Sequence, residues 1–272
     1  MNQILLQTKY ITIYSLWVAI AVAIIISTYT LVILSDKNHL KTQFISQNLL
    51  GLTIAGILGS RVLALALNTK TYFYSLSPNV LIKTLFVWDK GVSFTGTIIG
   101  GAIYLYFICK KEEQDYYKWL DVFVPSTIIA AAIIHIGTFF AGTHYGKPTR
   151  MPWGVNFESP TIKYIVPIHP SQIYGFIYSI AVFYILFIIS RNKELLKSKV
   201  SGIIALSGIC IYSFFELLNN FTRGDDTFFI ANIRINIFIQ AIIIIISGIL
   251  LRNRYNEHIK FKTVNNQHDE SN

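Results

Sequence analysis

The amino-acid sequence predicts an all-α, polytopic membrane protein with about seven transmembrane helices. Of the 272 residues, 53% are hydrophobic and 14% are charged, a balance too apolar for the surface of an ordinary soluble domain. Seven apolar runs approach or exceed the roughly 20 residues with which a helix crosses a bilayer. We expect one membrane domain over residues 1–255, followed by a polar, disordered cytoplasmic tail over 256–272.

The apolar runs follow one another along almost the whole chain. They cover residues 11–35, 44–67, 92–109, 119–141, 172–190, 200–219 and 233–251. The first run is a spanning helix rather than a cleaved signal peptide, because it is too long and lacks a small-residue cleavage site. The stretch AIIIII at 241–246 lies inside a longer apolar run, which favours a helix over a strand.

The distribution of positive charge predicts the orientation. The net charge is +9, but Lys and Arg concentrate in one set of short loops and in the C-terminal segment, as at Lys110, Lys111 and Arg252. Dense positive charge in short loops marks the cytoplasmic side, so we expect the N-terminus outside and the C-terminus inside, and no nucleic-acid partner. The long opposite loops, 68–91 and 142–171, are expected to form an ordered exterior cap.

Polar residues gather at one depth of the predicted bundle, toward its outer side. They are Tyr14, Arg61, Thr95, His135, Thr138, Tyr212 and Glu216. A charge inside the bilayer costs at least ~2.5 kcal/mol, so buried ionic groups pair or face a wet cavity. Arg61 and Glu216 could pair with each other to hold the bundle. The shared depth of the whole set favours a site that opens to the outer leaflet.

The hexapeptide HPSQIY at 169–174 begins the fifth run. Pro170 suits a first helical turn because it has no N–H to lose there. Tyr174 is typical of the membrane interface. Helix initiation leaves the clustering of His169, Ser171 and Gln172 unexplained. The two cysteines, Cys109 and Cys210, fall inside predicted spans and indicate neither a disulfide nor a metal site.

With these motifs in view, the chain resembles the prolipoprotein diacylglyceryl transferases, enzymes of the bacterial plasma membrane. Five segments carry the resemblance in order: NLLGLTIAGILGSRVL (48–63), VWDKGVSFTGTIIGG (87–101), IGTFFAGTHYGKPT (136–149) with PWGVNF (152–157), HPSQIY (169–174), and SG at 201–202 followed by Glu216. The resemblance implies transfer of a diacylglyceryl group from phosphatidylglycerol to a cysteine thiol of a lipoprotein precursor, with departure of glycerol phosphate. It also implies that the polar groups of HPSQIY brace the outer loops at the rim of the lipid site.

The chain departs from the family pattern at several polar positions. Thr95 stands where the family has His, His135 and Tyr212 stand where it has Arg, Thr138 stands where it has Asn, and Gly175 stands where it has an acid. Each of the first four replacements is still polar. His135 could therefore act as a base or as a donor to phosphate.

The resemblance and the polar layer together define the candidate site. The expected catalytic residues are His135, Glu216, Tyr212 and Thr95, and the expected lipid-binding residues are Tyr14, Arg61, Thr138, His169, Gln172, Tyr174 and Arg223. We expect phosphatidylglycerol and a lipoprotein precursor as partners, and neither a cofactor nor a metal. The alternatives are a transferase with another acceptor and a non-catalytic phospholipid-binding relative. A transporter ranks third, because the runs show no repeat.

Overall fold

A computed structural model of the chain describes residues 4–9, 12–67, 93–157, 162–191 and 200–270. The chain forms two compact units by its internal contacts. The first unit combines Met1–Lys37 with Tyr117–Asn272, and the second comprises Asn38–Tyr116. The candidate site discussed below lies in the first unit.

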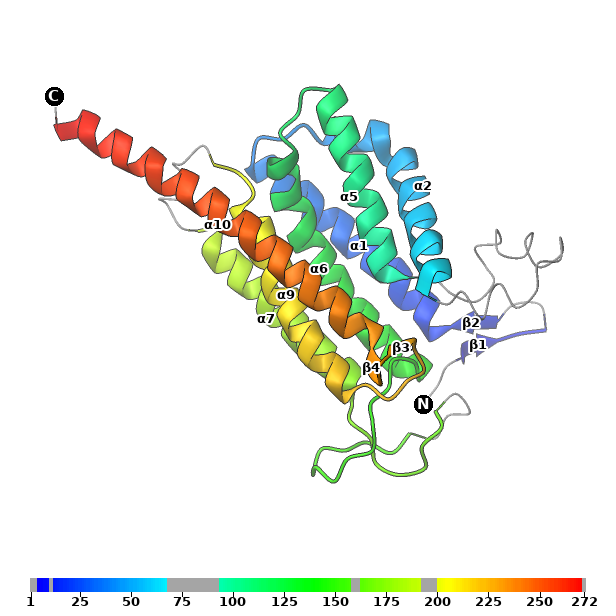
Figure 1. Ribbon diagram of the computed structural model, residues 1–272. Coiled ribbons are helices and arrows are strands. Elements are labelled where there is room, and N and C mark those ends of the chain that lie inside the picture. The colour runs from blue at the N-terminus through cyan, green and yellow to red at the C-terminus, as the bar shows by residue number, and fades with distance from the viewer. Residues whose placement is uncertain (1–3, 10–11, 68–92, 158–161, 192–199, 271–272) are drawn as a thin grey trace. The chain divides into compact units, whose positions relative to one another are not determined.

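The first unit is a helical bundle with two short hairpins. Its elements are β1 (Ile4–Gln7), β2 (Thr12–Tyr14), α1 (Ser15–Lys37), α6 (Tyr116–Ala141, with Tyr116 assigned to the second unit), α7 (Ser171–Ile189), α9 (Ile203–Thr222), β3 (Phe229–Ile230), β4 (Ile233–Arg234) and α10 (Ile235–Glu270). Helix α9 packs against both α7 and α10 (Figure 1). Apolar side chains from α6, α7 and α9 meet in a cluster around Ile128, Val182 and Leu186.

The first helix begins later than the sequence predicts. Residues 12–14 form strand β2, which pairs antiparallel with β1, and Tyr14 is its last residue. The β-branched and aromatic side chains of Thr12, Ile13 and Tyr14 favour an extended strand when a partner is available. Tyr14 therefore lies just before α1 rather than inside the first span.

The second unit contains α2 (Thr42–Leu67) and α5 (Phe94–Lys111), which pack closely through glycines. A side chain at Gly59 would meet the backbone of Gly96 and Gly100, and one at Gly100 would meet the backbone carbonyl of Ala55. Small residues let membrane helices approach closely, which explains why these glycines face one another.

Two adjacent glycines of α5 test this packing. Gly100→Ala is expected to lower the free energy of unfolding by about 1–3 kcal/mol, because its methyl group would overlap the Ala55 carbonyl. Gly101→Ala places its methyl group where no other helix among the described residues comes within 4 Å, so we expect no loss of stability. Thermal unfolding in detergent compares the two variants. Equal melting temperatures would contradict the close approach of α2 and α5.

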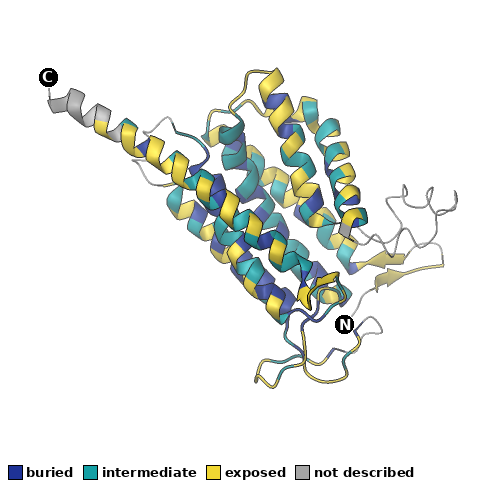
Figure 2. Ribbon diagram, in the orientation of Figure 1, coloured by how far each residue is buried: buried dark blue, intermediate teal, exposed yellow. Residues whose placement is uncertain are grey.

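The described helices are those of a multi-pass membrane protein. Six of them are long and apolar enough to cross a membrane: α1, α2, α6, α7, α9 and α10. Helix α5, which corresponds to the third predicted span (92–109), has 18 residues and ends in Lys110 and Lys111, which lower its hydropathy. Large apolar side chains lie exposed on α1, α2, α5, α7, α9 and α10 (Figure 2). Such a surface suits contact with lipid and exceeds what monomeric soluble proteins expose.

The second of the two long loops predicted to form a cap is ordered, and we call it the cap. Residues 142–157 and 162–170 form isolated β-bridges between Pro148 and Ile168 and between Val155 and Ile168. Tyr145, Phe157, Ile162 and Ile168 bury one another in a small core of their own. The other predicted cap segment, 68–91, lies outside the described residues.

The last two helices differ from the prediction at their ends. Helix α9 begins at Ile203, where the Asp121 carboxylate of α6 accepts hydrogen bonds from the backbone N–H groups of Gly202 and Ala205, at 2.6 and 2.7 Å. Helix α10 runs to Glu270, so the tail expected to be disordered is helical in this structure. No Gly or Pro interrupts residues 249–270, and an Arg254–Glu257 ion pair lies along this stretch.

Candidate active site

Three polar side chains from three helices meet at one depth of the first unit. His135 lies six residues before the end of α6, Glu216 lies six residues before the end of α9, and Tyr178 lies seven residues after the start of α7. With a rise of 1.5 Å per residue, all three lie roughly 10 Å from the helix ends that carry the cap. The predicted layer of polar groups therefore exists for these helices.

Hydrogen bonds connect the three side chains in a series. The Tyr178 hydroxyl donates to the Glu216 carboxylate, and His135 Nε2 lies 3.3 Å from the same hydroxyl oxygen. With the hydroxyl proton directed to the carboxylate, we assign His135 as the neutral tautomer that donates from Nε2 to Tyr178, since this tautomer completes the series. His135 Nδ1 is then unprotonated, and it has no hydrogen-bond partner among the described residues.

The position of the imidazole depends on a glycine. A side chain at Gly175 of α7 would overlap the ring of His135. The Tyr178 ring packs edge-on against His135 and Tyr212, with ring centroids 5.8 and 5.4 Å apart, and it stacks on Phe215. The absent side chain at 175 and these aromatic rings together fix the orientation of His135.

A network of charges continues from Glu216 toward the cap. Arg223 Nη1 lies 3.7 Å from Glu216 Oε1, and the Arg223 guanidinium binds both carboxylate oxygens of Asp225, at 3.0 and 2.6 Å. Arg234 binds Asp225 Oδ1 from another direction, at 2.9 Å. The positive charges of Arg223 and Arg234 thus balance the negative charges of Asp225 and Glu216. Burial alone would raise the pKa of Asp225, but the hydrogen bonds and positive charge of Arg223 outweigh it and hold that pKa below its ordinary value.

Tight turns place the two arginines. Arg223 follows α9 directly and forms an isolated β-bridge with Gly146 of the cap. Arg234 ends the hairpin β3–β4, whose turn residues Ala231 and Asn232 have φ angles of 48° and 63°. Two-residue turns of this kind match the twist of a hairpin. The hairpin therefore delivers Arg234 to Asp225 at the point where α10 begins.

The same charges shift the pKa of His144 in the cap. The positive charge of Arg223, and secondly burial, lower the pKa of His144 to about 3. The His144 side chain is exposed, so the charge of Arg223 is the main cause of the lower pKa. Solvent screening reduces the effect of this charge on stability.

Acidification is expected to destabilise the protein through His144. Between pH 6.5 and about 3 the unfolded chain binds a proton at this residue that the folded chain does not bind. The free energy of unfolding therefore falls as the pH falls through this window. His144→Asn is expected to lose less stability than wild type between about pH 7 and about pH 5, as measured by thermal unfolding. Equal losses in the two proteins would contradict this role.

The hexapeptide HPSQIY holds the cap to the bundle. Ser171 Oγ donates to the carbonyl oxygen of His144 at 2.6 Å, and Gln172 Nε2 donates to that of Thr143 at 2.7 Å. The Tyr174 hydroxyl accepts from Trp153 Nε1 at 2.7 Å and lies 3.2 Å from His169 Nδ1. The polar groups of this motif thus hold the segment that contains Thr143, His144 and Trp153 against the start of α7.

The sequence pattern of one known family matches nearly the whole chain. The family is described as prolipoprotein diacylglyceryl transferase, and residues 3–252 match it. The chain belongs to this family. The phosphatidylglycerol–prolipoprotein diacylglyceryl transferase of Clostridium tetani is 33% identical over 260 residues, which cover 93% of this chain and 97% of the relative.

Other relatives share the same description over shorter stretches. The Pseudomonas fluorescens protein is 33% identical over 157 residues, covering 57% of this chain and 56% of the relative. The Finegoldia magna protein is 29% identical over 171 residues, covering 62% of this chain and 63% of the relative. The phosphatidylglycerol–prolipoprotein diacylglyceryl transferases are thus similar to this chain over its membrane helices and its cap.

Of the residues expected to be catalytic in this family member, three come together. His135, Tyr212 and Glu216 all lie around Tyr178. Thr95 is the second residue of α5 and belongs to the second unit. Tyr178 itself was not predicted as a site residue, although it follows Tyr174 by one helical turn and therefore lies on the same face of α7.

The residues expected to bind lipid do not come together in one place. Arg223 reaches Glu216, whereas Thr138 donates to the carbonyl oxygen of His135 at 2.8 Å and so bonds within its own helix. Tyr14 ends strand β2. The three predicted residues of the hexapeptide hold the cap. Arg61 is buried in α2 of the second unit. Asp225 and Arg234 were missed, because they lie in a loop and a hairpin where no helical periodicity points to a site.

Proposed function

We propose that this family member transfers a diacylglyceryl group from phosphatidylglycerol to a cysteine thiol of a lipoprotein precursor. One observation carries the proposal: the hydrogen-bonded series from His135 through Tyr178 to Glu216, which leaves His135 Nδ1 unprotonated. A thiol becomes a nucleophile when it loses its proton. A positioned imidazole with a free nitrogen lone pair can accept that proton.

The reaction balances with one proton transfer. The thiol gives its proton to His135 Nδ1, and the thiolate sulfur forms a bond to the glyceryl carbon that carries the phosphate ester. The bond between that carbon and the phosphate oxygen breaks, and its electron pair leaves with glycerol phosphate. His135 later releases its proton to the departing phosphate or to water, which restores the starting state.

His135 meets two needs of this chemistry in turn. Once protonated, its imidazolium lies next to the Tyr178–Glu216 pair, whose carboxylate stabilises the new positive charge. That charge is present when negative charge builds on the leaving phosphate, and electrostatic stabilisation is strong in a site of low dielectric. Tyr178 and Glu216 act as positioning residues in this scheme.

The site must face the leaflet and compartment that supply its substrates. A secreted precursor lies outside the plasma membrane, which requires the cap and the His135 cluster at the outer side. The concentration of Lys and Arg near the other helix ends supports this orientation. We therefore place the N-terminus outside and the C-terminus in the cytoplasm.

A bacterial strain depleted of its own transferase tests the proposed activity. Expression of this protein is expected to restore growth and the lipid modification of a reporter lipoprotein, detected as a shift in mass. The control is the same plasmid carrying His135→Ala at an equal level of protein in the membrane. Failure of the wild-type protein to modify the reporter, at good membrane expression, would exclude the standard activity.

A non-catalytic phospholipid-binding role is the second candidate. It is favoured by the engagement of the Arg223 guanidinium, which binds both carboxylate oxygens of Asp225 and lies 3.7 Å from Glu216, and so is not free to neutralise a leaving phosphate. Radiolabelled phosphatidylglycerol distinguishes the two functions in purified protein. Release of glycerol phosphate in the presence of a thiol peptide supports transfer, whereas binding without release supports the second candidate.

A further inference from the structure

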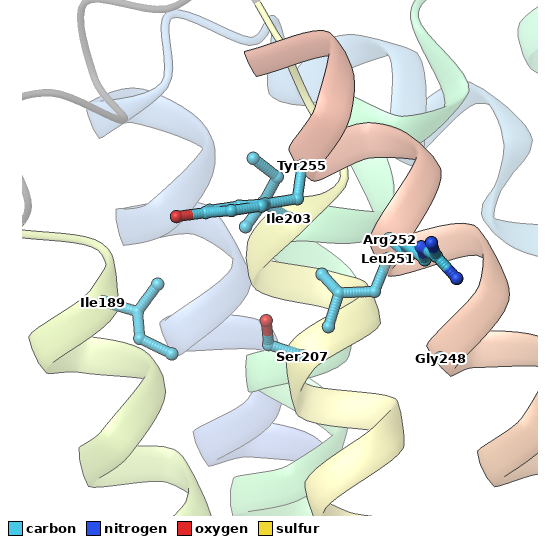
Figure 3. A pocket seen from close by; sticks show the side chains of 7 residues that line it. All are labelled: Ile189, Ile203, Ser207, Gly248, Leu251, Arg252 and Tyr255. Carbon is cyan, nitrogen blue, oxygen red and sulfur yellow. The ribbon is translucent and has the colours of Figure 1, made fainter. Parts of the chain in front are cut away.

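An open groove lies at the basic ends of α7, α9 and α10, away from the His135 cluster. Its volume is about 480 Å³, and Ile189, Ile203 and Leu251 form its apolar wall (Figure 3). Ser207, which also lines the groove, precedes Glu216 by nine residues on α9. At 1.5 Å per residue, the two sites are separated by roughly 13 Å along the helix axis.

The hydroxyl of Ser207 has no partner in the described part of the chain. Ser207 is 9% exposed, and its side chain points into the groove in Figure 3. By contrast, Ser179 and Ser247 donate to carbonyl oxygens of their own helices, at 2.6 and 2.7 Å. A polar group in apolar surroundings costs free energy unless it is hydrogen-bonded. Ser207 therefore offers a hydrogen bond to a molecule in the groove.

Gly248 leaves space on the facing helix. A Cβ at this position of α10 would meet no atom of the other described parts of the chain within 4 Å. The space lies beside Ser207 and is bordered by Leu251, so an apolar chain can lie between α9 and α10 there.

Arg252 and Tyr255 lie one and two turns nearer the polar end of α10 than Gly248. Arg252 is exposed and makes no hydrogen bond or ion pair with another described residue. The neighbouring Arg254, in contrast, lies over the Tyr117 ring and binds Glu257. Ile203 is the first residue of α9 and Ile189 is the last residue of α7, so both lie near the helix ends, as Leu251 and Arg252 do. The groove thus presents a cation, a phenol and apolar side chains near the helix ends, and a hydroxyl with open space at Gly248 one turn farther in.

We propose that this groove binds one anionic diacyl phospholipid from the leaflet at the basic end of the bundle. The groups suit the lipid: Arg252 takes the phosphate, and Ser207, one turn farther in, donates to an ester carbonyl oxygen. The glyceryl part lies against Ile203 and Leu251, and the acyl chains continue past Gly248 along the exposed apolar surface of α10, which includes Ile245. Anionic lipids are attracted by basic residues beside membrane helices. The proposal is independent of transferase activity, because its lipid lies at the opposite end of α9.

Native mass spectrometry of the full-length protein, purified in a mild detergent with added phosphatidylglycerol or phosphatidylcholine, tests the proposal. Gly248→Leu fills the groove, and its matched control is Gly101→Leu, since a side chain at Gly101 also meets no atom within 4 Å. Arg252→Gln removes the cation, and its control is Lys260→Gln, an exposed basic residue farther along α10. Ser207→Ala removes one oxygen and is the mildest change.

Wild type and both controls are expected to retain phosphatidylglycerol in preference to phosphatidylcholine. Gly248→Leu is expected to lower the retained phosphatidylglycerol about tenfold, a loss of about 1.4 kcal/mol. Arg252→Gln is expected to remove the preference for the anionic lipid, and Ser207→Ala to lower retention of both lipids. Equal retention by Gly248→Leu and Gly101→Leu would overturn the proposal. If Gly248→Leu does not fold, unchanged retention by both Ser207→Ala and Arg252→Gln would overturn it instead.

Transfer activity is measured on the same preparations. A groove variant that loses lipid but keeps transfer supports the groove and leaves the proposed function intact. If the wild-type protein shows no transfer, but Gly248→Leu retains less lipid than wild type, the proposed function is contradicted and the groove is still supported.

Discussion

His135→Ala is expected to abolish diacylglyceryl transfer while the protein stays folded in detergent. The alanine removes the group that accepts the thiol proton, and general base catalysis contributes about 10²- to 10⁴-fold to a rate. The variant leaves the Tyr178–Glu216 hydrogen bond in place, and His135 is partly exposed rather than a core residue. We therefore expect a small change in melting temperature beside a large loss of rate.

Two tyrosines of α7 provide the matched control. Tyr178→Phe removes the hydroxyl that joins His135 to Glu216 and is expected to slow transfer and to change its pH profile. Tyr184→Phe alters an exposed tyrosine of the same helix and is expected to change neither the rate of transfer nor its pH profile. The measurement is transfer from labelled phosphatidylglycerol to a thiol peptide. If His135→Ala lowers the melting temperature and keeps full activity, His135 is a packing residue and the proposed site is wrong.

Asp225→Ala, in the loop between α9 and β3, is expected to be strongly destabilising. It would leave the guanidinium groups of Arg223 and Arg234, which are 8% and 3% exposed, without the carboxylate between them. Breaking a buried ion pair by removing one partner costs about 3–5 kcal/mol, because the remaining charge is uncompensated. A loss of this size is a large part of the total stability of a typical protein.

Asp226→Ala, a change at the adjacent aspartate, distinguishes loss of the buried ion pairs from a general loss of negative charge. Asp226 binds Lys163 at 2.7 Å, but its side chain is 90% exposed, and exposed pairs are worth about 0–1 kcal/mol. Thermal unfolding of Asp225→Ala and Asp226→Ala in detergent measures the difference, and equal melting temperatures would refute the buried network. Because the pKa of Asp225 is depressed, its stabilising effect is lost as the pH falls from its ordinary value of 3.8 through the lower folded value.

The membrane helices could be predicted from the sequence because length and hydropathy decide them. A span of about 20 apolar residues must satisfy its backbone hydrogen bonds internally, so a helix follows from local sequence. The predicted run 172–190 corresponds to α7, for example, with a shift of one residue at each end. Prediction from local sequence fails where a second segment pairs with the first. Residues 12–14, for example, form a strand because β1 pairs with them.

The helices, the depth of His135 and Glu216, and the helix start at HPSQIY could all be inferred from local sequence. Which polar groups touch follows instead from how the helices pack. Tyr178 joins His135 to Glu216 because α6, α7 and α9 pack at that height, and Gly175 accommodates the imidazole because its side chain is absent. Asp225 and Arg234 meet Arg223 because a loop and a hairpin fold back over the helix ends. Hydrogen bonds and ion pairs act over a few ångströms between segments distant in sequence, so their partners follow from packing and not from periodicity.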